Sequence, residues 1–232
     1  MLGHRGARHA APENTLAAFD LARQEGADGV ELDVRLDGGG RVIVLHDPTL
    51  ERVTGGAESR HAEDIPSSEL SRLDVGSGER IPLLAEVLAW ARTHEQRVNI
   101  ELKSNVRRRA LLLERVAEVV RSVPLPPVLC SSFHPHFVWW LARHIPDLPR
   151  AWLVHDKQRL LKYAPGSHLL GANGVHPEHV LATAERVARL KRTGCLVNVW
   201  TVNDPARARQ LARNGVDAII SDVPGEILRG LG

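Results

Sequence analysis

Cysteine is scarce in this sequence, and long apolar runs are missing from it. The two cysteines among its 232 residues, Cys130 and Cys195, lie in apolar, strand-like runs and form no CxxC pair. A disulfide scaffold is therefore not indicated, and we expect reduced thiols in the core. No segment approaches the roughly 18 uninterrupted apolar residues that a membrane helix needs. We therefore expect no stable membrane insertion.

The N-terminus lacks the apolar stretch of a secretory signal peptide, because His4, Arg5 and Arg8 stand in its place. If Met1 is the true start of the chain, we expect a cytoplasmic protein. Charge of one sign is not in excess either: 30 basic and 28 acidic residues give a net charge of +2, and the longest basic block is Arg107 to Arg109. Nucleic-acid binding is therefore not expected.

Lysine is also rare, with four residues in the whole chain, so a lysine at the end of a strand, such as Lys103, calls for a specific explanation. Apolar residues make up 43% of the sequence and charged residues 25%. Such a chain can bury the core of one large domain or of two small ones. The pattern of elements along the chain must decide between them.

Short apolar runs alternate with segments of helical period throughout the chain. The first run, at Leu2, precedes a helix expected between Asn14, as its N-cap, and Gly26. Further strands are expected at 30–34, 98–102, 128–130, 151–154, 169–175, 196–202 and 218–220, and further helices at about 83–95, 105–122, 134–144, 156–164, 178–192, 205–213 and 223–231. Eight such units predict an α/β fold, a closed (β/α)8 barrel, with an open doubly wound sheet as the alternative.

One connection is irregular. Between Pro48 and Pro82 the chain is loop-rich, with glycines at 55, 56, 76 and 78, and it is longer than an ordinary strand-to-helix loop. We interpret it as an excursion over one mouth of the barrel, because it is too short to build a core of its own. Residues 1–232 are therefore predicted to form a single domain.

The stretch VELDVRLDGGGRVIVLHDP at 30–48 gathers polar side chains beside the second strand. Glu31 and Asp33 are two residues apart, so both leave the strand on the same face, near its carboxyl end. If the glycine-rich turn centres near residue 39, the returning segment brings residue 45 or 46 level with residue 32 or 33. His46 is thereby predicted to lie beside Glu31 and Asp33, at the mouth where barrels assemble active sites.

Two further strand ends carry matching chemistry. His4 and Arg5 close the first strand, and Glu101 with Lys103 closes the third with the same two-residue spacing. Three carboxylates without a cysteine suit one hard divalent cation, Mg²⁺ or Ca²⁺. The predicted metal ligands are thus Glu31, Asp33 and Glu101. Arg5 and Lys103 suit an anion bound next to that cation, above all a phosphate.

Two histidines beside a bound phosphate suggest acid–base catalysis. Since an imidazole titrates near pH 6.5, His4 and His46 can serve as the base and the acid of an in-line displacement. A diester needs the acid most, because its alcohol is a poor leaving group. Trp200, at the end of the seventh strand, is predicted to form an apolar wall for the substrate, whereas His134 and His136 are interpreted as capping and packing residues.

Eight segments of the chain resemble the glycerophosphodiester phosphodiesterase family in order and spacing. They are GHRG at 3–6, PENT at 12–15, VELDV at 30–34, VIVLHD at 42–47, IPLLAEVL at 81–88, NIELK at 99–103, VWTVN at 199–203 and IISDVP at 219–224. The resemblance implies a (β/α)8 barrel that uses a divalent cation to hydrolyse small-molecule glycerophosphodiesters, such as glycerophosphocholine or glycerophosphoethanolamine, to sn-glycerol 3-phosphate and an alcohol.

The resemblance also implies roles for single residues. It makes His4 and His46 the acid–base pair, Glu31, Asp33 and Glu101 the metal ligands, and Arg5 and Lys103 the phosphate contacts. It places Glu13 close to the site. The turn is a departure, because the family often has TKDG where this sequence has LDGGG.

Two alternatives remain open at the level of sequence. One is a lysophospholipase D-type enzyme on the same fold, which needs an apolar collar that Leu50, Val53, Ile65 and Leu70 of the excursion could supply. The other is a non-catalytic phosphate-binding barrel. The sequence also leaves open the headgroup, the choice between Mg²⁺ and Ca²⁺, the oligomeric state, and whether water or the glycerol 2-hydroxyl attacks first.

Overall fold

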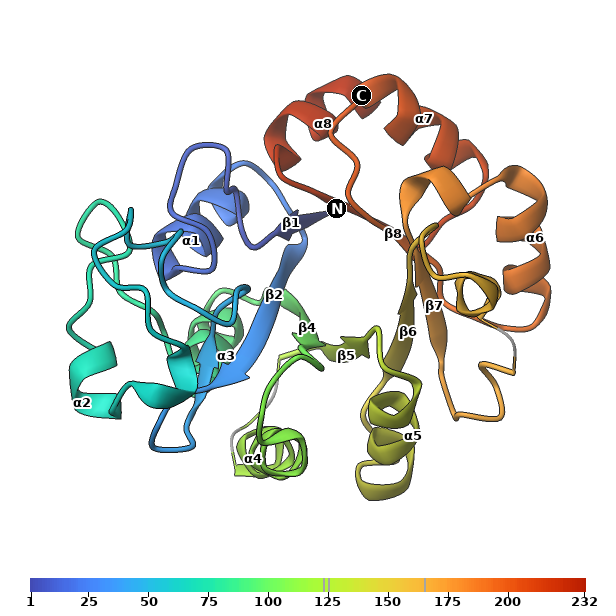
Figure 1. Ribbon diagram of the computed structural model, residues 1–232. Helices are drawn as coiled ribbons and strands as arrows, with labels where there is room; N and C mark the ends of the chain where they lie inside the picture. Colours follow the sequence, from blue (N-terminus) through green and yellow to red (C-terminus); the bar gives the residue numbers. More distant parts are fainter. Residues whose placement is uncertain (123, 125, 165) are drawn as a thin grey trace.

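Eight parallel strands form a barrel in the computed structural model, which describes residues 1–122, 124, 126–164 and 166–232 (Figure 1). The strands are β1 (Leu2–His4), β2 (Gly29–Leu36), β4 (Arg97–Leu102), β5 (Val128–Ser132), β6 (Arg150–Val154), β7 (Gly174–Pro177), β8 (Asn198–Val199) and β9 (Ala218–Ser221). They pair in the order β7-β6-β5-β4-β2-β1-β9-β8. Parallel bridges from Gly174 to Leu196 and from Glu178 to Trp200 join β7 to the β8 segment. The predicted barrel is confirmed, and the open sheet is wrong.

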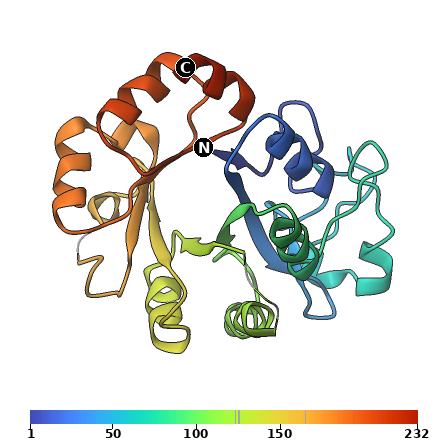
Figure 2. The same ribbon diagram turned by 180° about the vertical axis from the view of Figure 1, so that it is seen from behind.

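Helices cover the outside of the barrel, as the views from both sides show (Figure 1 and Figure 2). They are α1 (Leu16–Gln24), α3 (Leu84–Thr93), α4 (Arg109–Ser122), α5 (Pro135–His144), α6 (Ala184–Arg192), α7 (Pro205–Arg213) and α8 (Pro224–Leu231). Their apolar stripes pack on the outward side chains of the strands, such as Val30, Leu32 and Ile100. Within the described part of the chain, no helix is long and apolar enough to span a membrane.

Two expected helices differ from the prediction. The segment 156–164 forms only a short 3-10 turn, η2 (Leu160–Tyr163), in which no residue is buried. Without a buried stripe, a helix of this length is marginal. The expected helix at 178–192 is divided into a 3-10 turn, η3 (His179–Leu181), and α6, because the Thr183 hydroxyl accepts a hydrogen bond from the amide of Arg186 at 3.2 Å and starts the helix there.

The first helix begins one residue later than expected. Thr15, not Asn14, is its N-cap, and the Thr15 hydroxyl accepts from the amide of Ala18 at 3.2 Å. Asn14 instead adopts a left-handed backbone with φ of 59°, and its side-chain amide donates to Oδ2 of Asp33 at 3.0 Å. The prediction for Asn14 was wrong because its contact with Asp33 of β2 determines its conformation, and local sequence does not reveal that contact.

The hairpin after β2 has the predicted register. Strand β3 (Val42–Val44) runs antiparallel to β2, with Val34 opposite Val44 and Leu36 opposite Val42, so the turn centres on residue 39. The amide of Leu45 then donates to the carbonyl of Asp33 at 2.9 Å. His46 is thereby returned to the end of β2, where the site was expected.

The excursion at 48–82 contains a 3-10 turn, η1 (Ala62–Asp64), and a short helix, α2 (Ser67–Leu70). Together with β3 it encloses a small apolar cluster of its own, made of Ile43, Leu45, Leu50, Ala62, Ile65, Leu70, Val75 and Ile81. The excursion alone was too short for a core, and β3 supplies the missing apolar side chains. Leu50, Ile65 and Leu70 are therefore buried and do not form the apolar collar that a lysophospholipase D-type enzyme needs.

Candidate active site

The three predicted carboxylates meet inside the carboxyl-terminal mouth of the barrel. Glu31 and Asp33 project inward from β2, and Glu101 projects inward from the neighbouring β4, where it pairs in register with Asp33. Each offers a carboxylate oxygen, these oxygens lie within 4.8 Å of one another, and all three residues are buried. A buried group of three hard oxygen donors fits one Mg²⁺ or Ca²⁺ ion.

Two cations neutralise part of this charge. The ammonium of Lys103 lies 2.7 Å from Oε1 of Glu101 and 2.8 Å from Oδ1 of Asp33. The side-chain Nε of Arg5 lies 3.2 Å from Oδ2 of Asp33, and the main-chain amide of Arg5 donates to Oε2 of Glu31 at 3.2 Å. Arg5 and Lys103, the predicted phosphate contacts, are therefore held beside the carboxylates, where a bound anion can contact them as well.

Burial and charge separate the pKa values of these carboxyls. Burial raises the pKa of Glu31 well above its ordinary value, and the charges of Asp33 and Glu101 act in the same direction. Burial also raises the pKa of Glu101, although the charge of Lys103 opposes it. For Asp33 burial is outweighed by Lys103 and Arg5, which hold its pKa far below the ordinary value. The group thus contains one firmly ionised carboxylate and two that a nearby cation would help to ionise.

His4 stands at the end of β1 with both ring nitrogens directed to carboxylates. Its Nδ1 lies 2.6 Å from Oδ1 of Asp222, and its Nε2 lies 3.9 Å from Oε2 of Glu31. Asn203 holds Asp222 in place, because its side-chain amide donates to Oδ2 at 2.8 Å and its oxygen accepts from the Asp222 amide at 2.9 Å. The contact to Asp222 orients Nε2 of His4 toward the carboxylate group.

His46 is oriented in the same way. Its Nδ1 lies 2.6 Å from Oδ1 of Asp47, and Nε of Arg52 donates to the other oxygen of Asp47 at 2.6 Å. Arg52 also binds Glu13 through both guanidinium NH₂ groups, at 2.8 Å each, so the excursion is tied to the first strand-to-helix loop. Burial lowers the pKa of His46 from its ordinary value, which favours the neutral imidazole.

A pocket of about 300 Å³ opens beside His46. Its lining includes Arg35, Glu101, Lys103 and Phe133. Arg35 is buried, and its Nε donates to the main-chain oxygen of His46 at 2.8 Å. Phe133 extends the apolar side of the site, because its ring meets that of Trp200 edge to face at 5.4 Å.

Trp200, the residue predicted to form an apolar wall, packs against Phe133. Phe133 lines the pocket beside His46, and the indole Nε1 of Trp200 donates to the carbonyl of His176 at 2.8 Å. Phe133, which no sequence motif singled out, therefore connects Trp200 to the pocket beside His46.

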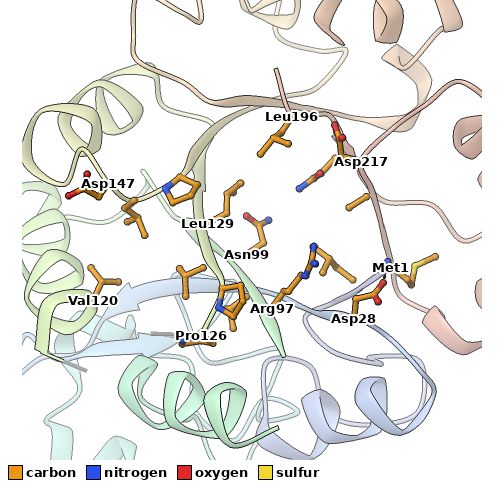
Figure 3. Close-up of a pocket in the computed structure, with 18 of the residues that line it drawn as sticks. Met1, Asp28, Arg97, Asn99, Val120, Pro126, Leu129, Asp147, Leu196 and Asp217 are labelled. Atoms are coloured by element: carbon orange, nitrogen blue, oxygen red, sulfur yellow. Dashed lines mark hydrogen bonds and ion pairs between the residues drawn. The ribbon is translucent and has the colours of Figure 1, made fainter. Parts of the chain in front are cut away.

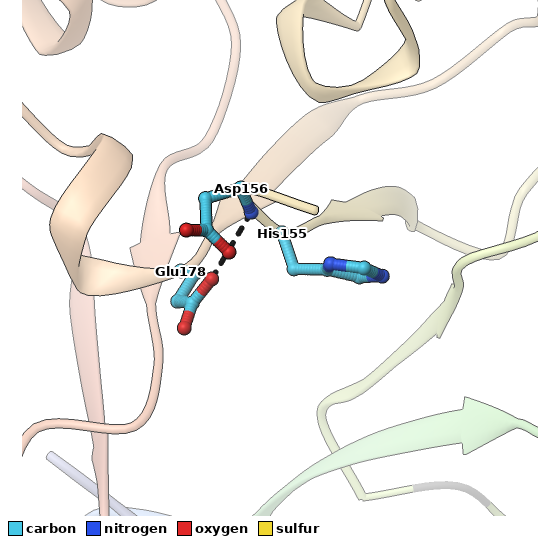
Figure 4. A group of neighbouring side chains, drawn as sticks. All are labelled: His155, Asp156 and Glu178. Atoms are coloured by element: carbon cyan, nitrogen blue, oxygen red, sulfur yellow. Dashed lines mark hydrogen bonds between the residues drawn. The ribbon is translucent and has the colours of Figure 1, made fainter. Parts of the chain in front are cut away.

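The described part of the chain also contains a cavity and a second group of possible metal ligands away from this site. A cavity of about 590 Å³ lies at the amino-terminal mouth, where Asn99, Leu129 and Leu196 point inward (Figure 3), and none of the predicted site residues lines it. His155, Asp156 and Glu178 at the ends of β6 and β7 also offer ligand atoms within 4.8 Å of one another, but they are only partly buried or exposed. In that group the amide of Asp156 donates to Glu178 at 3.1 Å (Figure 4).

The structure gathers His4, Arg5, Glu31, Asp33, His46, Glu101 and Lys103 at one mouth of the barrel. Sequence reasoning missed Asp47, Asp222 and Arg35. Asp47 follows His46 directly, and Asp222 lies in the IISDVP segment, so each was visible as an acid near a strand end. Neither has a spacing that marks it as a partner for a histidine.

Comparisons with known proteins match this chain to glycerophosphodiester phosphodiesterases. A model of the Glycerophosphoryl diester phosphodiesterase family matches residues 4–226. The chain is 32% identical to a glycerophosphodiester phosphodiesterase of Bacillus altitudinis over 99% of this chain and 96% of that protein. It is 31% identical to another from Caldanaerobacter subterraneus subsp. tengcongensis, over 98% and 96% respectively.

Solved structures agree with these matches. An Oleispira antarctica phosphodiesterase in complex with the product sn-glycerol-3-phosphate superposes with a TM-score of 0.87, at 30% identity, over 99% of this chain and 95% of that chain. A protein from Silicibacter pomeroyi superposes with a TM-score of 0.88, at 28% identity, over 99% and 92%. The barrel fold is therefore shared along nearly the whole chain.

Proposed function

The chain belongs to the glycerophosphoryl diester phosphodiesterase family, and from that premise we propose that residues 1–232 act as one catalytic domain that hydrolyses glycerophosphodiesters to sn-glycerol 3-phosphate and an alcohol. Membership makes the protein a phosphoric diester hydrolase, so the alternative of a non-catalytic barrel is wrong. Glycerophosphocholine and glycerophosphoethanolamine are the proposed substrates. A relative bound to sn-glycerol-3-phosphate supports this product.

The observation that carries the proposal is a buried carboxylate group with two carboxylate-held imidazoles at the same mouth of the barrel. Oxygen atoms of Glu31, Asp33 and Glu101 lie within 4.8 Å of one another. His4 lies 3.9 Å from Glu31 through its Nε2, and His46 shares a pocket with Glu101. Nothing in a structural barrel requires a buried lysine, a partly buried arginine, three buried carboxylates and two such histidines together, because buried charges are costly.

Charge balance supports a divalent cation bound by the three carboxylates. With Arg5 and Lys103 protonated and all three carboxylates ionised, the site carries a net charge of about −1, which would repel a phosphodiester. A bound Mg²⁺ or Ca²⁺ would reverse this sign and polarise the phosphoryl oxygens. Arg5 and Lys103 then lie close enough to the carboxylates to contact the same phosphate.

The histidines move protons at defined atoms. Asp222 holds Nδ1 of His4 and Asp47 holds Nδ1 of His46, so in each ring Nε2 is the atom directed to the substrate. One imidazole takes the proton of the attacking hydroxyl, and the other protonates the oxygen of the leaving alcohol. Attack by water and attack by the glycerol 2-hydroxyl use the same two atoms, and phosphorus NMR separates the routes through the cyclic phosphate of the second.

The test is release of glycerol 3-phosphate from a panel of headgroups, with and without EDTA. We expect turnover that EDTA abolishes and that added Mg²⁺ or Ca²⁺ restores. His4→Ala and His46→Ala should each lower kcat by about 10²- to 10⁴-fold. His144→Ala is a matched control, because His144 lies at the end of α5 and its ring contacts Trp140. Full activity of His4→Ala or His46→Ala would refute the assigned roles.

A further inference from the structure

A cluster of exposed apolar side chains lies on the segments that follow β6 and β7, at the same end of the barrel as the candidate active site. Leu160, Leu161 and Tyr163 of η2 are 77%, 43% and 55% exposed, and Val180 of η3 is 52% exposed. Tyr163 and Val180 line one hollow of about 260 Å³, so η2 and η3 are neighbours. In Figure 1 η2 is the yellow-gold turn next to α6. We call these four residues the apolar patch.

Basic side chains surround the apolar patch. Lys157, Arg159 and Lys162 lie on or next to η2, and among the described residues none of them forms an ion pair with an acidic side chain. The ammonium of Lys162 lies 5.5 Å from the ring centre of Tyr163. Arg189 lines the same hollow as Tyr163, with one acidic neighbour, Glu185. With Asp156, Glu178 and Glu185 counted against these four, the surface remains positively charged.

The apolar patch is held at the same end of the barrel as the catalytic residues. Phe133, which lines the pocket beside His46, contacts the ring of His155 at 5.5 Å, and His155 begins the segment that leads to η2. The hydrogen bond from Asp156 to Glu178 fastens the start of that segment to the end of β7 (Figure 4). Arg186 of α6 donates to the carbonyl of Lys162 and fastens its other end.

We propose that the apolar patch and its basic rim dock the catalytic mouth onto an anionic lipid surface. Leucine, tyrosine and lysine together are the side chains that favour the boundary between headgroups and acyl chains. Lysine and arginine keep their charges at the headgroups while their stems follow the apolar side chains inward. Two leucines on one tight turn bury little area against a flat protein surface, whereas a stable protein interface needs ~800 Å² per partner.

Docking of this kind differs from insertion of a helix and does not depend on turnover. It would present the mouth of the site to lipid-derived phosphodiesters as they form at a membrane. The proposal concerns binding of the surface alone, so it can fail while the proposed hydrolysis stands.

The experiment is co-sedimentation of the full chain with vesicles of phosphatidylcholine containing phosphatidylglycerol, and with vesicles of phosphatidylcholine alone. We expect binding to the anionic vesicles that weakens as salt is added. The triple variant Lys157→Gln/Arg159→Gln/Lys162→Gln should weaken binding by about 100-fold, since each basic residue near an anionic surface contributes roughly fivefold. The variant Leu160→Ser/Leu161→Ser should also lose binding.

Two controls keep the outcome clear. Leu231→Ser changes an exposed leucine on α8, outside the apolar patch, and should bind vesicles like the unchanged protein. Hydrolysis of water-soluble glycerophosphocholine should be the same for all variants, which shows that they are folded. Absence of vesicle binding, or binding that both patch variants retain, would overturn the proposal. So would a change in oligomeric state on Leu160→Ser/Leu161→Ser without vesicle binding, because the patch would then contact a second copy.

Discussion

Nδ1 of His4 lies 2.6 Å from Oδ1 of Asp222, although 218 residues separate them in the chain. β1 and β9 are adjacent parallel strands, so the first and last strand-to-helix loops meet at one mouth of the barrel. Asp222 therefore holds Nδ1 of His4, while the other ring nitrogen, Nε2, lies 3.9 Å from Oε2 of Glu31. A carboxylate in this position selects the tautomer of the ring.

Asp222→Asn should lower kcat by about 10- to 100-fold while KM changes little, because the amide leaves His4 in place but no longer selects the tautomer that His4 needs for proton transfer at Nε2. Steady-state kinetics on glycerophosphocholine measure both constants. Asp147→Asn is the matched control, since Asp147 lines the cavity at the opposite mouth (Figure 3). A rise in KM with unchanged kcat would instead assign Asp222 to substrate binding.

Asp47→Asn should move one limb of the pH–rate profile to lower pH. The pKa of His46 is already lowered, first by burial, and the hydrogen bond that Asp47 accepts from the ring acts in the opposite direction. Without that carboxylate the pKa of His46 falls further, so the limb moves the same way whether His46 is the base or the acid. Profiles of kcat/KM against pH for both proteins measure the shift. A limb that stays in place, or moves to higher pH, would contradict the role of Asp47.

The sequence predicted the barrel and most of the site because both depend on local periodicity. Strand parity placed Glu31 with Asp33 and Glu101 with Lys103, and a turn centred on residue 39 was enough to return His46. These inferences need only the alternation of side chains along a strand. They hold as long as the strands are parallel and in register.

The rest depends on contacts between distant segments. Asn14 was expected to cap a helix, but its side-chain amide donates to Asp33 of β2. Asp222 meets His4 only because the barrel closes. The helix expected at 156–164 had helical period but no partner to bury its leucines. Such pairings are decided by tertiary structure, which overrides local preference.

Glu31→Gln should stabilise the metal-free protein at neutral and alkaline pH. Burial raises the pKa of Glu31 well above its usual value of about 4.5 in the folded state. As the pH rises above about 4.5, the unfolded chain releases this proton first, so the folded state loses stability until its own raised pKa is passed. Glutamine removes this loss. Thermal unfolding with EDTA should give a higher Tm for the variant above that pH, and a shrinking difference toward acid pH.

The same variant should lose most of its response to a divalent cation. Added Mg²⁺ or Ca²⁺ should raise the Tm of the unchanged protein, since an ion that binds only the folded state stabilises it. Glu31→Gln should show a much smaller rise, together with loss of turnover. Glu114→Gln, on the exposed face of α4, is the control for both measurements. An equal cation response in the two proteins would show that Glu31 is not a ligand.

Lys103→Met separates two roles that the geometry gives to one side chain. As counter-ion of Asp33 and Glu101, Lys103 is buried, and removing one partner of a buried ion pair costs about 3–5 kcal/mol. The metal-free variant should therefore have a clearly lower Tm, and added Mg²⁺ should raise that Tm by more than in the unchanged protein, because the cation replaces the lost charge.

Lys191→Met is the control. It breaks the more exposed pair with Asp217, 2.5 Å apart, and should lower the free energy of unfolding by at most about 1 kcal/mol. If Lys103 also contacts the phosphate, kcat/KM stays low at saturating Mg²⁺. Full recovery of activity there would leave Lys103 as a counter-ion only.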